Sequence, residues 1–121
     1  MVLTPHRAVQ PDVIFIANPR LHIIGERVEG PADLVAEVLS PASRRRDRLD
    51  KRDLYEQHGV KEYWLLDPEA LTVEVLFLER GEYRLVGRWQ SEGQAVSRLL
   101  PGFKLSVKTL FKRSVQAKGQ R

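Results

Sequence analysis

The chain has 121 residues, of which 42% are hydrophobic and 30% are charged; it has no cysteine, and its formal net charge is +4 at pH 7. This length accommodates one hydrophobic core, and the lack of cysteine excludes disulfide frameworks and thiolate metal sites. No apolar run approaches the roughly 20 residues that span a bilayer. Residues 1–12 also lack the apolar core of a signal peptide, so we expect no membrane association and a cytoplasmic location.

The basic excess is confined to the C-terminal end. Residues 112–121 carry four of the 20 basic residues and none of the 16 acidic ones, so the rest of the chain is balanced. We therefore expect one domain at residues 1–111, followed by a disordered basic tail at residues 112–121. Such a tail adds unspecific attraction to nucleic acid, or simply aids solubility as a solvated terminus.

Two strands are predicted in the first third of the chain. The first is PDVIFI (residues 11–16), which is rich in β-branched and aromatic residues and has proline only at its entry. ANPR then turns the chain, while residues 21–30 fit either a loop or a short strand. The second strand is DLVAEVL (residues 33–39). Its apolar residues fall on both alternating faces, which is typical of a central strand covered on both sides.

A helix and further strands follow. Ser43 is a suitable N-cap for a helix that runs to about His58, and Gly59 is a suitable terminator. EYWLLD (residues 62–67) predicts a third strand, and residues 71–90 alternate around Gly81 as in a β-hairpin. A last apolar segment, residues 98–111, closes the domain. The order of elements indicates an α+β fold.

Glu37 stands inside the second predicted strand, where an unpaired carboxylate would cost several kcal/mol. If the first two strands are neighbours, Asp12 and Glu37 point to the same face of the sheet. The following helix packs back over this sheet and can bring Lys51 to the same place, with Asp47 one helical step away. Asp33 shares the face of Glu37 and can join the site from its edge.

Two carboxylates suit Mg²⁺ or Mn²⁺, and a lysine beside them can activate a water or stabilise charge on a phosphate. These groups are the ingredients for hydrolysis of a phosphodiester. Each residue also has a structural interpretation. Asp12 is typical of a strand entry, Lys51 can be a solvated helix residue paired with Asp47, and Glu37 can form a buried salt bridge with an arginine.

A basic cluster covers the start of the predicted helix, where the helix dipole disfavours cations. This misfit favours contacts with phosphate, although a solvated face is the common alternative. The cluster consists of Arg44, Arg45, Arg46 and Arg48.

Three stretches together resemble the Uma2 family of endonucleases, which have the restriction endonuclease-like PD-(D/E)XK fold. They are QPDVIFI, the long segment GPADLVAEVLSP…RRRDRLDKRDLYEQHGVKEYWLLDPEALTVEVL, and LLPGFKLSV. The resemblance runs from about Val9 to Val107. It implies a restriction endonuclease-like mixed β-sheet with a core helix and a C-terminal antiparallel extension.

The resemblance also implies roles for individual residues. Asp12 and Glu37 correspond to the two metal-binding acids, and the backbone carbonyl of Val38 would be a further ligand for Mg²⁺ or Mn²⁺. The lysine expected two residues after the second acid is absent, because position 39 is leucine. In Uma2-like proteins the next helix supplies this lysine, which here is Lys51.

Compared with Uma2-like proteins, this chain has only ten residues before Pro11 and lacks their usual N-terminal region. It is expected to be an abbreviated member, a chain with a mis-assigned start, or a decayed copy. The exposed sheet edge then needs covering by a second copy or by another chain, and we expect a homodimer. The expected function is Mg²⁺-dependent hydrolysis of DNA. The alternative is a non-catalytic family member that acts as an oligomerisation or nucleic-acid-binding module.

Overall fold

The computed structural model describes residues 1–4, 7–8, 11, 13–16, 18–24, 30–40 and 45–112, with only the backbone described at residues 7, 8, 13, 18, 19 and 45–47. Its centre is a five-stranded mixed sheet with the strand order β3-β4-β5-β6-β7. The strands are β3 (Val13–Phe15), β4 (Leu34–Val38), β5 (Glu62–Asp67), β6 (Thr72–Glu79) and β7 (Glu82–Gln90). Only the β4–β5 pair is parallel among these neighbours.

Smaller elements surround this sheet. Strands β1 (Val2–Thr4) and β2 (Arg7–Ala8) pair near the N-terminus, and β3 is followed by a 3₁₀ helix, η1 (Asn18–Ile23). The helix α1 (Arg45–Gln57) connects β4 to β5. Strands β8 (Gln94–Val96) and β9 (Lys104–Ser106) form a second hairpin, and residues 107–112 are helical.

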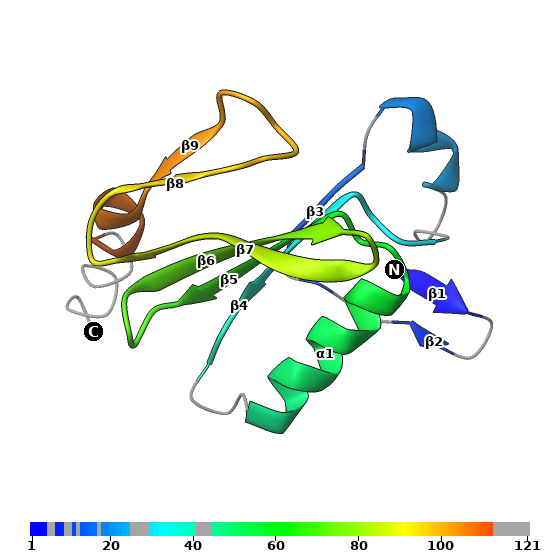
Figure 1. Cartoon of the computed structure of the whole chain (residues 1–121), viewed down its shortest axis with the longest axis horizontal. Helices are drawn as coiled ribbons and strands as arrows, with labels where there is room; N and C mark the ends of the chain where they lie inside the picture. Colours follow the sequence, from blue (N-terminus) through cyan, green and yellow to red (C-terminus); the bar gives the residue numbers. More distant parts are fainter. Residues whose placement is uncertain are drawn as a thin grey trace.

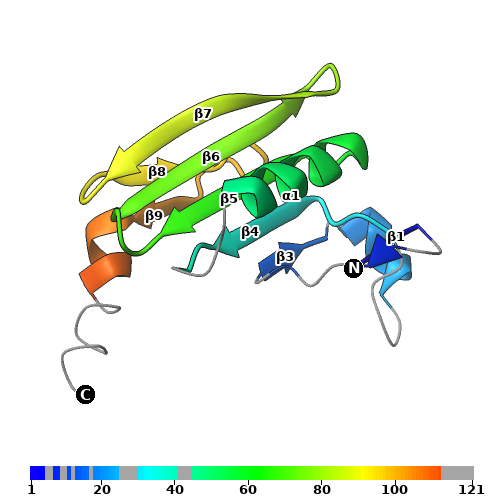
Figure 2. The ribbon, with the colours of Figure 1, turned by 90° about the horizontal axis from the view of Figure 1, so that it is seen from below.

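The two faces of the central sheet are covered by different elements (Figures 1 and 2) and carry separate hydrophobic cores. Helix α1 covers one face, where Val35, Tyr55 and Tyr63 are almost fully buried. The β8–β9 hairpin and residues 107–112 cover the other face, around Trp64 and Val75. Strand β4 is therefore a covered central strand, as its apolar residues on both faces predict.

Helix α1 ends where the sequence places its terminator. Gly59 has a φ of 79°, a backbone conformation that glycine adopts at little cost. The N–H of Val60 donates to the carbonyl of Tyr55, and the N–H of Gly59 to that of Glu56, as in a Schellman motif. This cap turns the chain directly into β5, which fixes the helix over the sheet.

The β6–β7 hairpin turns at Arg80 and Gly81, which both have positive φ, between the register partners Glu79 and Glu82. Such a two-residue turn matches the twist of the strands that it joins. The hairpin predicted at residues 71–90 is confirmed, and so is the strand predicted at residues 62–67.

Glu62 anchors the outer layer to the sheet. Its fully buried carboxylate accepts hydrogen bonds from Trp64 Nε1 (2.8 Å) and Ser97 Oγ (2.6 Å). It also accepts from the backbone N–H groups of Arg98 (2.8 Å) and Leu99 (2.9 Å). One carboxylate therefore holds the segment after β8 against β5.

Some details differ from the sequence-based expectations. Residues 18–23 form a 3₁₀ helix, where we expected a turn followed by a loop or short strand. The strand predicted at residues 33–39 spans Leu34–Val38, and the helix spans Arg45–Gln57, since Ser43 lies outside the described residues. Of the predicted tail, Lys112 is helical and residues 113–121 lie outside the described part. No helix in that part is long and apolar enough to cross a membrane.

Candidate active site

Glu37 lies in β4 on the face that α1 covers, and it is only 5% exposed. The hydroxyl of Tyr55 donates a hydrogen bond to its Oε1 (2.5 Å), and Lys51 Nζ lies 3.5 Å from its Oε2. Both partners come from α1. The carboxylate inside the strand is therefore held by a neutral donor and a cation from the helix above it.

Lys51 and Tyr55 are four residues apart, so they project from the same side of α1. Tyr55 is fully buried, whereas the side chain of Lys51 is 45% exposed. The helix thus inserts its C-terminal half into the core and leaves its N-terminal half at the edge of the sheet. Lys51 is therefore in contact with solvent, whereas Glu37 beneath it is almost fully buried.

All three tyrosines of the chain lie in the core between α1 and the central sheet. The rings of Tyr55 and Tyr63 pack edge to face at 5.2 Å, and that of Tyr83 lies 6.0 Å from Tyr63. Burial raises the pKa of each hydroxyl, and the hydrogen bond to Glu37 raises the pKa of Tyr55 further. Tyr55 therefore remains a proton donor to Glu37 at neutral pH.

We expect these tyrosines to make the fold sensitive to alkali. An unfolded tyrosine ionises at about pH 10, whereas each folded one keeps its proton to higher pH. The stabilisation is complete below pH 10. Above it, the unfolded state binds fewer protons, and the free energy of unfolding falls by about 1.4 kcal/mol per pH unit for each tyrosine.

An alkaline titration that follows tyrosinate absorbance and circular dichroism together tests this. Both signals should change in one transition, and Tyr55→Phe should flatten the dependence of stability on pH. Reversible ionisation near pH 10 in a protein that stays folded would contradict the expectation.

Two arginines extend the basic edge of α1. Arg48 and Arg52 are half-buried and share the sheet-facing side with Lys51 and Tyr55. Burial and the charge of Glu37 raise the pKa of Tyr63, and the charges of Arg48 and Arg52 oppose this rise. Among the described residues, neither has a hydrogen bond or an ion pair. They leave positive charge available beside Glu37.

A cavity of about 160 Å³ opens between this side of α1 and the sheet, lined by Arg48, Leu49, Arg52, Leu65 and Glu74. Leu65 is the register partner of Glu37 on β5. The cavity therefore lies one strand away from the buried carboxylate, with two arginines on its helical wall. An anion such as phosphate fits this charge arrangement.

Comparison with known proteins identifies the family and the fold of the chain. Residues 1–108 match the sequence model of Uma2, which is described as "Putative restriction endonuclease". The chain belongs to the Uma2 family. The resemblance expected from QPDVIFI and EVLSP is thereby confirmed.

The fold of this Uma2 protein is similar to a solved structure. The crystal structure of a protein from Anabaena variabilis ATCC 29413, described as a "putative nuclease belonging to DUF820", superimposes with a TM-score of 0.69 at 23% identity. The match covers 86% of this chain and 60% of the other, so this chain spans less than two thirds of its neighbour. The α+β class with a mixed sheet is confirmed. No curated protein matches the chain.

The structure locates only part of the predicted Uma2 site. Glu37 and Lys51 lie together, as the strand and helix pattern predicts. Asp12 and Arg44 lie outside the described residues. Arg45, Arg46 and Asp47 belong to α1, but their side chains are outside the description, so Arg48 alone represents the predicted basic cluster.

Asp33 is not brought to Glu37. Its buried carboxylate pairs with Arg20 (2.9 Å) and lies 3.8 Å from Lys61 Nζ. Four residues of extended strand place the two Cα atoms about 13 Å apart. The two acidic residues share a face of the sheet, and Asp33 forms its ion pairs with Arg20 and Lys61; its accessory role stays a prediction.

Two residues of this neighbourhood were not predicted. The hydroxyl of Tyr55 binds Glu37, so this core residue also belongs to the surroundings of the site. Arg52 was not singled out. Its spacing of four residues from Arg48 and its position next to Lys51 are the signals that identify it.

The described residues fit a divalent metal only in part. Glu37 offers a buried carboxylate beside the half-exposed Lys51, and carboxylate oxygens suit a hard cation. Within the described ranges, however, no three side chains of the types His, Cys, Asp and Glu gather into a metal site. A second carboxylate from Asp12 would be required, and that residue is outside these ranges.

Proposed function

We propose that this Uma2 protein is an endonuclease that hydrolyses phosphodiester bonds of DNA with the help of Mg²⁺ or Mn²⁺. One observation carries the proposal: a buried carboxylate, Glu37, is held beside Lys51 at the edge of a helix that also presents Arg48 and Arg52. Membership of a family described as restriction endonucleases supports the reaction class.

Glu37 and Asp12 would hold the cation, together with the backbone carbonyl of Val38. A divalent cation at this position would polarise the phosphate and lower the pKa of a water bound to it. Lys51 reaches the same place and stabilises the negative charge that develops on the phosphate oxygens as water adds to phosphorus and the P–O bond breaks. The hydrolysis yields a phosphate monoester and a hydroxyl group.

The other residues position these groups. Tyr55 fixes one oxygen of Glu37, so that the carboxylate keeps one orientation. Arg48 and Arg52 bind the backbone next to the scissile phosphate through charge-assisted hydrogen bonds. Arg44, Arg45 and Arg46, at or before the start of α1, would extend this contact along the strand.

The decisive experiment compares the wild type with Glu37→Gln. Plasmid and single-stranded DNA are incubated with Mg²⁺ or Mn²⁺, and the heat of metal binding is measured separately. The wild type should cleave DNA and bind metal. The variant should lose metal binding and about 10³-fold in cleavage rate, because an amide is a poor ligand for a hard cation. It should stay folded, since the amide oxygen can still accept from Tyr55.

Asp53→Asn is the matched control, because Asp53 is an exposed carboxylate on the same helix. Cleavage and metal binding should be unchanged in this variant. Wild-type protein that binds DNA with a steep salt dependence but neither binds metal nor cleaves would contradict the proposal. That result would establish the non-catalytic nucleic-acid-binding module instead.

A homodimer is also proposed. Strand β3 is one edge of the central sheet and β7 is the other. An edge strand presents backbone N–H and C=O groups that can pair with a second chain. Pairing two copies through β3 would place two Glu37–Lys51 sites on one particle, as cleavage of both DNA strands requires.

A further inference from the structure

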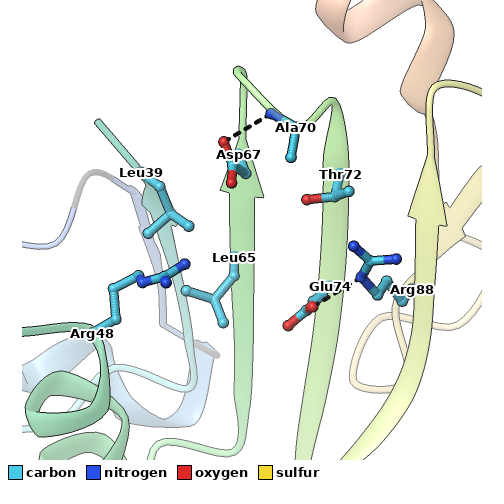
Figure 3. Close-up of a pocket in the computed structure, with 8 residues that line it drawn as sticks. All are labelled: Leu39, Arg48, Leu65, Asp67, Ala70, Thr72, Glu74 and Arg88. Carbon is cyan, nitrogen blue, oxygen red and sulfur yellow. Dashed lines mark hydrogen bonds and ion pairs between the residues drawn. The ribbon is translucent and has the colours of Figure 1, made fainter. Parts of the chain in front are cut away.

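A second cavity, of about 140 Å³, lies on the sheet surface next to the one that holds Arg52 (Figure 3). Arg48 enters it from α1, and Arg88 borders it from β7 on the opposite side. Leu65 and Glu74, which are register partners, lie between them. The full lining is Leu39, Arg48, Leu65, Asp67, Ala70, Thr72, Glu74 and Arg88.

This cavity adjoins the candidate active site. Leu65 is the register partner of Glu37 on one side and of Glu74 on the other, so the three residues form one row across β4, β5 and β6. Adjacent strands are about 4.8 Å apart, which puts Glu74 about 10 Å from Glu37 along the sheet. A nucleotide whose phosphate lies near Glu37 can therefore extend its base to the cavity beside Glu74.

The polar groups of the cavity are held in place but keep free hydrogen-bonding positions. Asp67 Oδ1 accepts from the N–H groups of Glu69 (3.0 Å) and Ala70 (3.1 Å). Glu74 Oε1 accepts from Arg88 Nε at 3.1 Å. Among the residues whose placement is described, Asp67 Oδ2 and the two terminal nitrogens of Arg88 have no hydrogen-bond partner. Each is therefore available to a ligand.

The lining argues against a second phosphate. Two carboxylates, Asp67 and Glu74, would repel an anion, whereas the first cavity presents Arg48 and Arg52 with only Glu74 opposite. Leu39, Leu65 and Ala70 add apolar surface suited to a flat ring. The volume lies below the roughly 300 Å³ of a typical small-molecule site, so one ring system fits and a whole nucleotide does not.

We propose that this cavity is a nucleobase subsite that selects guanine next to the scissile phosphate. The inference rests on the proposed nuclease function and specifies its substrate preference. Arg48 borders both cavities, so a nucleotide can place its phosphate on Arg48 and Arg52 and its base against Asp67 and Arg88.

Guanine has hydrogen-bond acceptors for the free nitrogens of Arg88 and a donor for the free oxygen of Asp67. Its O6 and N7 atoms accept hydrogen bonds, and arginine is their commonest specific partner, which assigns them to the terminal nitrogens of Arg88. Its N2 amino group is a donor, which assigns it to Asp67 Oδ2. Adenine has no carbonyl and thymine has no amino group, so each lacks one half of this pattern. Cytosine has both groups, but its O2, N3 and N4 atoms lie along one edge, whereas guanine presents O6 and N7 on one edge and N2 on another.

The test is a titration of isotope-labelled full-length protein, without metal, with each deoxynucleoside 5′-monophosphate and with inorganic phosphate. The amide resonances of Ala70, Thr72 and Arg52 are followed. We expect dGMP to shift Ala70 and Thr72 with an affinity about tenfold tighter than dAMP, dCMP or dTMP. Inorganic phosphate should shift Arg52 and leave Ala70 unchanged.

Asp67→Asn identifies the group responsible. Asparagine can keep the turn through its amide oxygen but places a donor where Oδ2 accepted, so the affinity for dGMP should fall about tenfold. Glu69→Gln, an exposed change in the same turn, should leave it unchanged. Equal binding of the four nucleotides, or shifts at Ala70 with inorganic phosphate alone, would overturn the guanine subsite.

This readout requires neither metal nor cleavage, so the two proposals fail separately. Selective dGMP binding by a protein that cleaves nothing would refute the nuclease and retain the subsite. Metal-dependent cleavage without selective dGMP binding would retain the nuclease and refute the subsite.

Discussion

Lys51→Met is expected to lower metal-dependent cleavage by about 10²- to 10³-fold, because one positioned donor to the developing charge is lost. Methionine keeps the apolar stem of the side chain. The effect on stability should be small, since Lys51 is 45% exposed and its contact with Glu37 is 3.5 Å. Single-turnover cleavage with saturating protein separates this loss of rate from any loss of DNA affinity.

The chain contains a matched control for this variant. Lys61 is 57% exposed and lies 3.8 Å from the buried carboxylate of Asp33, which shares the sheet face of Glu37. Lys61→Met removes the same charge from an equivalent ion pair away from the proposed site. It should leave the cleavage rate within twofold of the wild type, by order of magnitude. Equal losses in the two variants would mean that Lys51 acts only through net charge.

Glu62→Ala is expected to reduce the free energy of unfolding by about 4 kcal/mol. The substitution leaves Trp64 Nε1, Ser97 Oγ and two backbone N–H groups without their shared acceptor. Urea unfolding followed by tryptophan fluorescence measures the loss, and Trp64 itself reports on the region.

The comparison for this variant is Glu82→Ala. Glu82 is 70% exposed and paired only with Arg84 at 3.7 Å, so its removal should change stability by less than about 0.5 kcal/mol. Glu62→Gln should fall between the two, because the amide retains one acceptor oxygen. A Glu62→Ala protein as stable as Glu82→Ala would show that solvent replaces the carboxylate.

The sequence predicted the central elements well where the local signals agreed. Residues 62–67 combine aromatic and aliphatic side chains with a proline stop, and residues 71–90 alternate around a glycine turn; both match the structure. The β8 strand and the 3₁₀ helix at residues 18–23 were not predicted. Both are short and contain mixed polar residues, so tertiary contacts rather than periodicity determine them.

For the site, the pattern identified Glu37 and Lys51 but not the partners that complete their surroundings. Alternation separates the two faces of a strand without revealing what covers each face. Tyr63 and Trp64 are adjacent in sequence, yet they belong to different cores. The hydroxyl of Tyr55 could not be assigned to Glu37 from spacing, because a buried aromatic residue is usually explained by packing alone.

The contacts around Glu37 have a consequence for how this family can change. Glu37, Lys51 and Tyr55 all belong to the continuous segment β4–α1–β5, and α1 is the connection between two adjacent parallel strands. Their relative positions are therefore encoded locally. Segments after β5 can diversify in length and sequence without moving these three groups, so new substrate preferences can evolve around the proposed site, whose other acid, Asp12, precedes β4.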